Sequence, residues 1–208
     1  GGEGDEAGSP LRKLGVVHNA ASFASIYLFS LYFQYVRGFD ARVAGGILLV
    51  ASLITASLVG YAGRLSDRGS PHLVAAAGVA MTVVGLAILS FIGEAMPLAV
   101  AVLALVLLVA GVAFFQPPVY STVIGAVERA MYGVAAGLVE TMRLLGMTVS
   151  MAVTIIIFAL FFGSMEIIGE NIPRFLWSMQ VLFRIYFALA VVSLAVTWLA
   201  GRAPPRAP

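Results

Sequence analysis

Long apolar runs, separated by short polar stretches, dominate the chain from residue 16 to residue 200. A helix needs about 20 mainly apolar residues to cross the hydrocarbon core of a bilayer. Six segments reach that length, at about 16–36, 42–63, 72–92, 97–126, 132–162 and 180–200. They lack the alternating pattern of membrane β-strands. The sequence therefore predicts an all-α polytopic membrane protein with six transmembrane helices in one bundle.

The composition excludes most other classes of protein. Hydrophobic residues make up 61% of the chain and charged residues 11%, against roughly 25% charged residues in soluble domains. The net charge of +2 and the absence of cysteine give no reason to expect a nucleic-acid partner or a disulfide framework. With two histidines, no clustered metal ligands and no Gly-x-Ser-x-Gly motif, we expect no metal, no cofactor and no enzymatic activity.

The ends of the chain differ from its middle. The first ten residues, GGEGDEAGSP, are acidic and rich in glycine, unlike the basic start and apolar core of a signal peptide. We predict a flexible linker or tail over 1–14, the transmembrane bundle over 15–201 and a cytoplasmic tail over 202–208. A chain that begins in a linker is expected to be a fragment or half of a larger protein.

Basic residues predict the orientation, because they favour the cytoplasmic side of a membrane. With the N-terminus inside, the inner side holds Arg12, Lys13, Arg64, Arg68, Arg129, Arg202 and Arg206. The outer side then holds Arg37, Arg42, Arg174 and Arg184. We therefore expect a plasma (cytoplasmic) membrane protein with both termini in the cytoplasm. The segment 163–180 is predicted to be an outer loop that lies on the membrane interface.

Charged residues inside a membrane are costly and need a reason. Glu140 and Arg143 lie three residues apart in the fifth span, so they are neighbours on one helix face. Met147, Ser150 and Thr154 continue the same stripe, which should face protein or water. Two readings stay open: an internal ion pair that locks helices together, or a titratable carboxylate and a cation in a transport pathway.

Two further spans contain polar residues that could line a pathway. Pro117 and Pro118 predict a kink in the fourth span, because two prolines interrupt the backbone hydrogen bonds. Gln116 and Tyr120 flank that kink and could border a cavity. Tyr32 is a further candidate in the unusually polar first span. A purely structural kink remains an equal alternative.

The stretch GRLSDRGSPHL (63–73) is the polar connection between the second and third spans. It resembles the loop motif of the major facilitator superfamily, with Gly63, Asp67 and Arg68 at matching positions. Ser70 and His72 stand where that motif usually has a second glycine and a basic residue. The resemblance implies a conformational latch, whereas a simple cytoplasmic turn would need no function.

A second stretch carries the same resemblance. The fifth span, from Gly133 and Gly137 through Arg143 to Gly146, is similar to the corresponding helix of the fourteen-span drug/proton antiporter branch of that family. Gly133 and Gly137 are four residues apart, a spacing of small residues that favours close helix packing. The resemblance implies twelve or fourteen spans in two bundles around a central cavity, with this chain as the C-terminal six-helix half. It also implies a second, N-terminal half of six or eight helices as the partner.

The function expected from these features is secondary active transport. The chain would take part in efflux of drugs or other small molecules by alternating access, with protons as a candidate coupling ion. Its partners would be the lipid bilayer, the substrate, and either the missing half or a second copy in a homodimer. The alternative is a scaffold or sensor subunit that has the same bundle and transports nothing.

Overall fold

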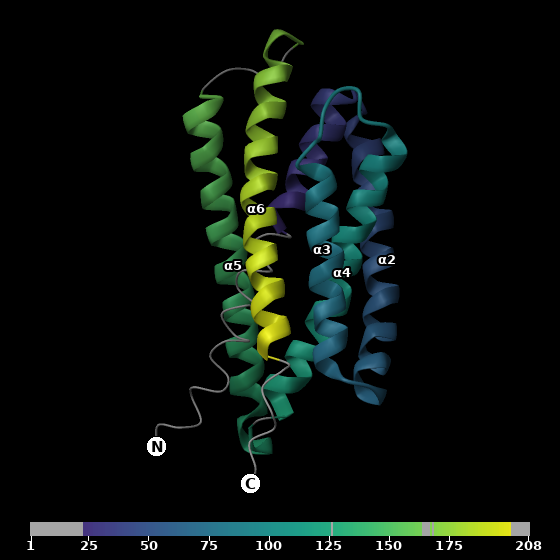
Figure 1. The fold of residues 1–208 in the computed structure, drawn as a ribbon, viewed down its shortest axis with the longest axis vertical. Coiled ribbons are helices and arrows are strands. Elements are labelled where there is room, and N and C mark those ends of the chain that lie inside the picture. The colour runs from purple at the N-terminus through teal and green to yellow at the C-terminus, as the bar shows by residue number, and fades with distance from the viewer. Residues whose placement is uncertain (1–22, 126, 164–166, 168, 201–208) are drawn as a thin grey trace.

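The computed structural model describes residues 23–125, 127–163, 167 and 169–200, and the regular structure in these ranges is all helical (Figure 1). A first apolar helix covers Phe23–Val36. It is followed by α2 (Ala41–Arg68), α3 (Pro71–Leu89), α4 (Leu98–Gly125), α5 (Tyr132–Phe161) and α6 (Ile172–Ala200). The all-α prediction is confirmed, and α2 to α6 are each long and apolar enough to cross a membrane. The predicted linker 1–14, the start of the first span and the tail 202–208 lie outside the described residues.

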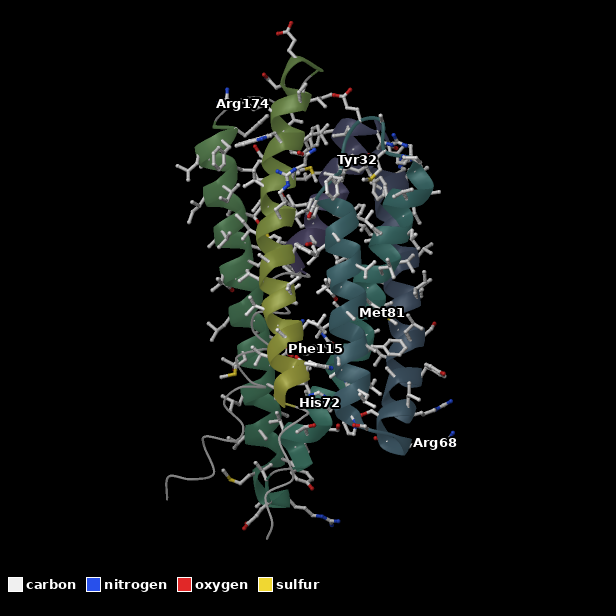
Figure 2. All side chains as sticks on the ribbon, viewed as in Figure 1. Tyr32, Arg68, His72, Met81, Phe115 and Arg174 are labelled. Carbon is white, nitrogen blue, oxygen red and sulfur yellow. The ribbon has the colours of Figure 1, made fainter. Side chains whose placement is uncertain are left out.

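The helices run up and down between two ends of the bundle (Figure 2). We call the end with the α2–α3 turn the Arg68 end, and the opposite end, where α6 begins, the Arg174 end. In Figure 1, α3 and α6 lie side by side at the centre, with α2 on one flank and α5 on the other. α4 packs closely on both α2 and α3, whereas α5 makes only small contacts with α4 and α6.

Two glycines allow α3 and α4 to touch through their backbones. A methyl group on Gly78 of α3 would lie 2.7 Å from the carbonyl oxygen of Gly111 and 2.7 Å from the amide nitrogen of Phe115. Both atoms belong to α4, and neither can move without moving that helix. Small residues of this kind allow close helix approach in lipid, where the packing itself holds helices together. The α3–α4 crossing is therefore the tightest contact that the glycines of the bundle show.

Side chains clamp the α3–α4 loop at the Arg174 end. Tyr32 is fully buried and its hydroxyl donates to the carbonyl of Gly93 at 3.0 Å. Arg37 donates to the carbonyl of Glu94 at 3.2 Å, and the Gln180 amide of α6 donates to the carbonyl of Ile92 at 2.7 Å. Three successive loop carbonyls thus accept hydrogen bonds from the first helix, from the residue that follows it and from α6. A π-helical turn over Tyr32–Val36 ends the first helix within this clamp.

Two helices are longer than the sequence predicts. α2 continues through Arg68, so only Gly69 and Ser70 remain as the turn before α3. α6 begins at Ile172, so most of the segment predicted as an interfacial loop is helical. Pro173 suits the first turn of a helix, where its missing N–H is not needed. Phe175 and Met179, read as interface residues or loop, are buried in the core.

Candidate functional site

A groove of about 460 Å³ opens between α2 and α4 near the Arg68 end. It brings together four of the predicted site residues, Gly63, Asp67, Gln116 and Tyr120. Its lining consists of Val59, Gly63, Ser66, Asp67, Gln116, Pro117, Tyr120, Ser121 and Ile124. The last turns of α2 supply the latch residues, and the proline region of α4 supplies the pathway candidates. Arg68 does not line the groove.

Several polar groups around this groove have no partner within the part of the chain that is described. The side chains of Asp67, Gln116 and Tyr120 form no hydrogen bond or ion pair there, and Tyr120 is 41% exposed. Ser66 is buried, and its hydroxyl oxygen also lacks a partner among the described residues. Because a polar group without a partner is costly wherever water is excluded, we expect water, a ligand or more protein to fill this groove.

The predicted kink does not divide α4 into two helices. α4 runs as one element through Pro117 and Pro118 to Gly125. Two side chains of the following turn, Ser121 and Thr122, donate to the carbonyl of Pro118 at 3.1 and 2.7 Å. Gly63, a glycine of the loop motif, has open space where a methyl group would stand.

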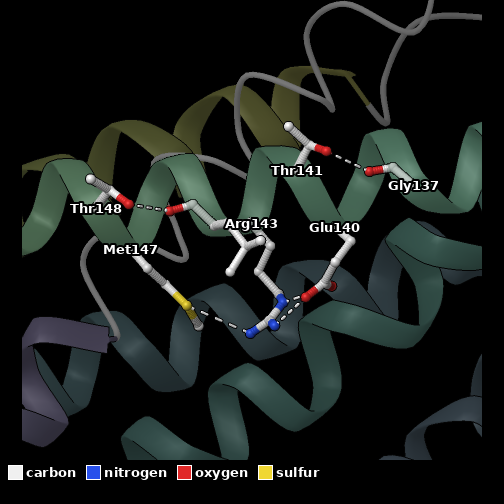
Figure 3. Close-up of polar contacts among 7 residues, drawn as sticks. Gly137, Glu140, Thr141, Arg143, Met147 and Thr148 are labelled. Atoms are coloured by element: carbon white, nitrogen blue, oxygen red, sulfur yellow. Dashed lines mark hydrogen bonds and ion pairs between the residues drawn. The ribbon is translucent and has the colours of Figure 1, made fainter.

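Glu140 and Arg143 form an ion pair on α5 (Figure 3). The Arg143 Nε donates to a Glu140 carboxylate oxygen at 2.9 Å, and a second guanidinium nitrogen contacts the other oxygen. The Arg143 guanidinium also reaches the sulfur of Met147 at 3.6 Å. The Glu140 side chain remains 48% exposed and the Arg143 side chain 32% exposed. The pair is therefore satisfied internally but uncovered on its outer side.

The stripe predicted on α5 divides into two parts. Ser150 and Thr154 are buried and meet the Tyr186 hydroxyl of α6, which lies 2.9 Å from the Thr154 hydroxyl and 3.0 Å from the Ser150 carbonyl. Glu140 and Arg143 lie nearer the Arg68 end and touch no neighbouring helix through a described polar contact. Only the second part of the stripe packs inside the bundle.

The open surface of α5 has two faces of different chemistry. At about 100° per residue, Gly133, Gly137 and Leu144 lie on the side of Glu140. A second face, rotated about the helix axis by a quarter-turn or more from the Glu140 side, is apolar. It consists of Leu138, Leu145, Val149, Ile156 and Leu160. Gly133 and Gly137 have nothing within 4 Å of the place where a methyl group would stand. The glycine pair predicted for close packing is thus free on the Glu140 side.

The structure separates the remaining candidates from these sites. Tyr32 lies in the loop clamp at the Arg174 end (Figure 2), far along the bundle from Arg68. His72, at the basic position of the loop motif, contacts the carbonyl oxygen of Thr197 and so ties α3 to α6. Among residues 23–125, 127–163, 167 and 169–200, no three His, Asp or Glu side chains gather as metal ligands would.

The position expected for one charged residue of the membrane helices was wrong. Arg184 was counted on the outer side, but α6 begins at Ile172 and carries it three turns inside the helix. Phe175 and Met179 of the preceding segment continue the four-residue spacing of Phe183, and this helical pattern was the signal that could have revealed the earlier start. Of the other described arginines, Arg37, Arg42 and Arg174 lie toward the Arg174 end and Arg64, Arg68 and Arg129 toward the Arg68 end, so the two ends carry equal numbers.

Much of the chain is similar to known proteins. Residues 13–151 match the family model of the Major Facilitator Superfamily, which is more than half of the chain. The Multidrug resistance protein Stp of Mycobacterium tuberculosis, from strains CDC 1551 / Oshkosh and ATCC 25618 / H37Rv, is 29% identical over 133 residues. The match covers 64% of this chain and 25% of that protein. The chain spans about a quarter of the length of the curated relatives it matches.

The match includes both motifs on which the sequence-based resemblance depends. The loop residues Gly63, Asp67 and Arg68 fall within residues 13–151. The same range contains the residues of the fifth span that carry the resemblance, Gly133, Gly137, Arg143 and Gly146. The family consists of membrane transporters and not of enzymes. The described residues hold six apolar helices, five of them long enough to span a membrane, and this chain is a multi-pass membrane protein that belongs to the Major Facilitator Superfamily.

Proposed function

We propose that this chain is the C-terminal six-helix bundle of a secondary active transporter, and that it moves small molecules by alternating access together with a second bundle. Family membership supports transport. The name of the Mycobacterium tuberculosis relative supports efflux of drugs as the direction and substrate class. Protons are the proposed coupling ion, and the second bundle is an N-terminal half or a second copy.

The open Glu140–Arg143 pair carries this proposal. An ion pair on a membrane helix loses the water that would solvate its charges, so lipid on its outer side would be costly. The side chains are 48% and 32% exposed within the chain, and the glycines beside them leave room for another surface. A water-filled pathway bordered by a second bundle satisfies both observations. It also leaves Glu140 accessible to a proton or to a cationic substrate.

The groove between α2 and α4 suggests a second role in the same cycle. Gly63 and Asp67 lie in the last two turns of α2, beside Gln116 and Tyr120 of α4. We infer that a segment of the second bundle enters this groove in one of the two closed arrangements. Asp67 would then act as a latch residue with Arg68 on the adjacent surface, and Gln116 and Tyr120 would border the pathway.

The orientation is part of the proposal. The Arg68 end would face the cytoplasm, with both termini on that side. Support comes from Arg12, Lys13, Arg202 and Arg206 of the sequence, since the described arginines at the two ends are balanced.

Flux in proteoliposomes tests the transport proposal. The full-length protein is reconstituted, a proton gradient is imposed, and ethidium is followed as the probe. Arg143→Ala should reduce gradient-driven flux about tenfold or more, because it leaves Glu140 unpaired at membrane depth. Arg129→Ala, in the exposed turn before α5, is the matched control and should keep normal flux. Equal flux in Arg143→Ala and the parent would remove the pair from the pathway. No gradient-driven flux in the parent would favour the scaffold alternative.

The same assay separates a latch from a substrate site. Asp67→Ala should change the maximal transport rate by several fold and leave the half-saturating ethidium concentration within about twofold. A changed half-saturating ethidium concentration at an unchanged maximal rate would instead indicate that Asp67 belongs to the substrate-binding site.

A further inference from the structure

Helix α6 carries a charged side chain on the face that points away from the bundle. Met179, Tyr186 and Ser193 recur every seven residues on α6 and are buried. Arg184 comes two residues before Tyr186, which places it about 200° further round the helix, on the opposite side. Arg184 is exposed. It lies twelve residues into α6, or about 18 Å along the helix axis.

Two tryptophans mark the membrane boundaries on that same face. Trp177, Arg184, Val191 and Trp198 follow one another at intervals of seven residues and are all exposed. The 21 residues between Trp177 and Trp198 span about 31 Å of helix, close to the thickness of the hydrocarbon core. Tryptophan favours both membrane–water interfaces. The face between them therefore borders lipid, and Arg184 lies about 10 Å below the Trp177 level.

No protein group neutralises Arg184 within the described ranges. It forms no hydrogen bond or ion pair there, and the carboxylates of Asp40, Glu94 and Glu170 at the Arg174 end form none with it. Gln180, one turn nearer the helix start, is already engaged with the carbonyl of Ile92. An arginine in this position needs a counter-charge from beyond the described residues.

We propose that Arg184 binds the phosphate of a membrane phospholipid in the leaflet at the Arg174 end. Side chains on a helix lean toward its N-terminus, which for α6 is the end that carries Trp177. A long side chain at this depth reaches upward to the interface while its methylene groups stay in hydrocarbon. The guanidinium fork matches the geometry of phosphate oxygens, with which it can form two parallel hydrogen bonds.

The Trp177 ring borders this site on the side nearer the membrane surface. It packs edge-on against Phe161 at the end of α5, with ring centroids 4.9 Å apart. The phosphate would lie between the Trp177 level and Arg184, so the leaflet would dip toward the helix at this point. The proposal concerns the lipid-facing side of α6 and does not depend on transport by the protein.

Quenching of tryptophan fluorescence by brominated lipids tests this site. The full-length protein is prepared with Trp177 as its single tryptophan and reconstituted in mixtures of brominated phosphatidylglycerol and brominated phosphatidylcholine. One arginine near a membrane surface favours anionic lipid about fivefold. Trp177 should report that preference in the parent. Arg184→Leu should reduce it to about equal binding, and Arg184→Lys should retain most of it.

A second single-tryptophan protein provides the control. Trp198 lies 14 residues from Arg184, or about 21 Å away, so its lipid preference should not change in Arg184→Leu. An unchanged preference at Trp177 in Arg184→Leu would overturn the proposal. So would an equal change at Trp198, which would indicate an effect on the whole bundle. A shift in oligomeric state with an unchanged preference would assign Arg184 to a contact between copies. Added inorganic phosphate should not compete; competition would indicate a site for free phosphate rather than lipid.

Discussion

Helices α3 and α5 both carry glycines on one face, but their surroundings are opposite. On α3, Gly78 meets the backbone of α4 so closely that a methyl group would lie 2.7 Å from two backbone atoms. On α5, Gly133 and Gly137 have open space within 4 Å. The same kind of residue thus closes one interface and leaves another surface free.

The difference separates folding from function in this bundle. The α3–α4 crossing has no charged residue and is completed within the chain. The open side of α5 carries the Glu140–Arg143 pair and is completed by nothing in the described residues. We therefore infer that α3 and α4 hold the bundle together, while the Glu140 side of α5 belongs to an interface or pathway shared with a second bundle.

The largest effect is expected when the closed interface is overfilled. Gly78→Ala places a methyl group against the Gly111 carbonyl and the Phe115 amide, and overpacking of this kind costs roughly 1–3 kcal/mol. The measurement is the unfolding midpoint of the full-length protein in detergent. Gly137→Ala is the comparison variant: it adds the same methyl group where this chain leaves open space, so it should lower the midpoint less than Gly78→Ala does. Equal losses in both variants would break the comparison between the two helices.

A smaller effect is expected at the contact that attaches α5 to α6. Tyr186→Phe removes the hydroxyl that meets Thr154 and Ser150, and should destabilise the protein by about 0.5–1.5 kcal/mol. Tyr132→Phe, at the exposed start of α5, should have no measurable effect on the same unfolding midpoint. A loss in Tyr186→Phe as large as that in Gly78→Ala would show that α5 is attached as firmly as α3.

Apolar run length predicted the membrane helices well. The predicted spans 42–63, 72–92, 97–126 and 132–162 agree with α2 to α5 at most ends, because composition changes sharply where the helices leave the membrane. α6 was predicted to begin at 180 instead of 172. Its first turns contain Arg174 and Trp177, whose polar or amphipathic side chains lower the local hydropathy even though the other face is buried.

Residue contacts between helices could not be predicted from one sequence. The chain has 22 glycines, and spacing alone favoured Gly133 and Gly137 for close packing. The contact occurs at Gly78 and Gly111 instead, because it depends on which helix lies opposite. The polarity of Tyr32 likewise suggested a pathway residue. Its hydrogen bond to the Gly93 carbonyl could not be predicted, because the two residues are 61 positions apart in the sequence. The Glu140–Arg143 pair was predictable, since its geometry is set within one helix.

Two adjacent leucines on α5 provide the most direct test of whether its Glu140 side is shared with a pathway or second bundle. Leu144 and Leu145 are 51% and 55% exposed within this chain, at nearly the same depth, but only Leu144 lies on the Glu140 side. Each is replaced by a spin-labelled cysteine in the full-length protein, and collisions with oxygen and with a water-soluble nickel complex are measured. At position 145, collisions with oxygen, which concentrates in lipid, should outnumber collisions with the nickel complex. At 144, oxygen collisions should be several fold fewer, because protein and water cover that face. Equal dominance of oxygen at both positions would contradict the account.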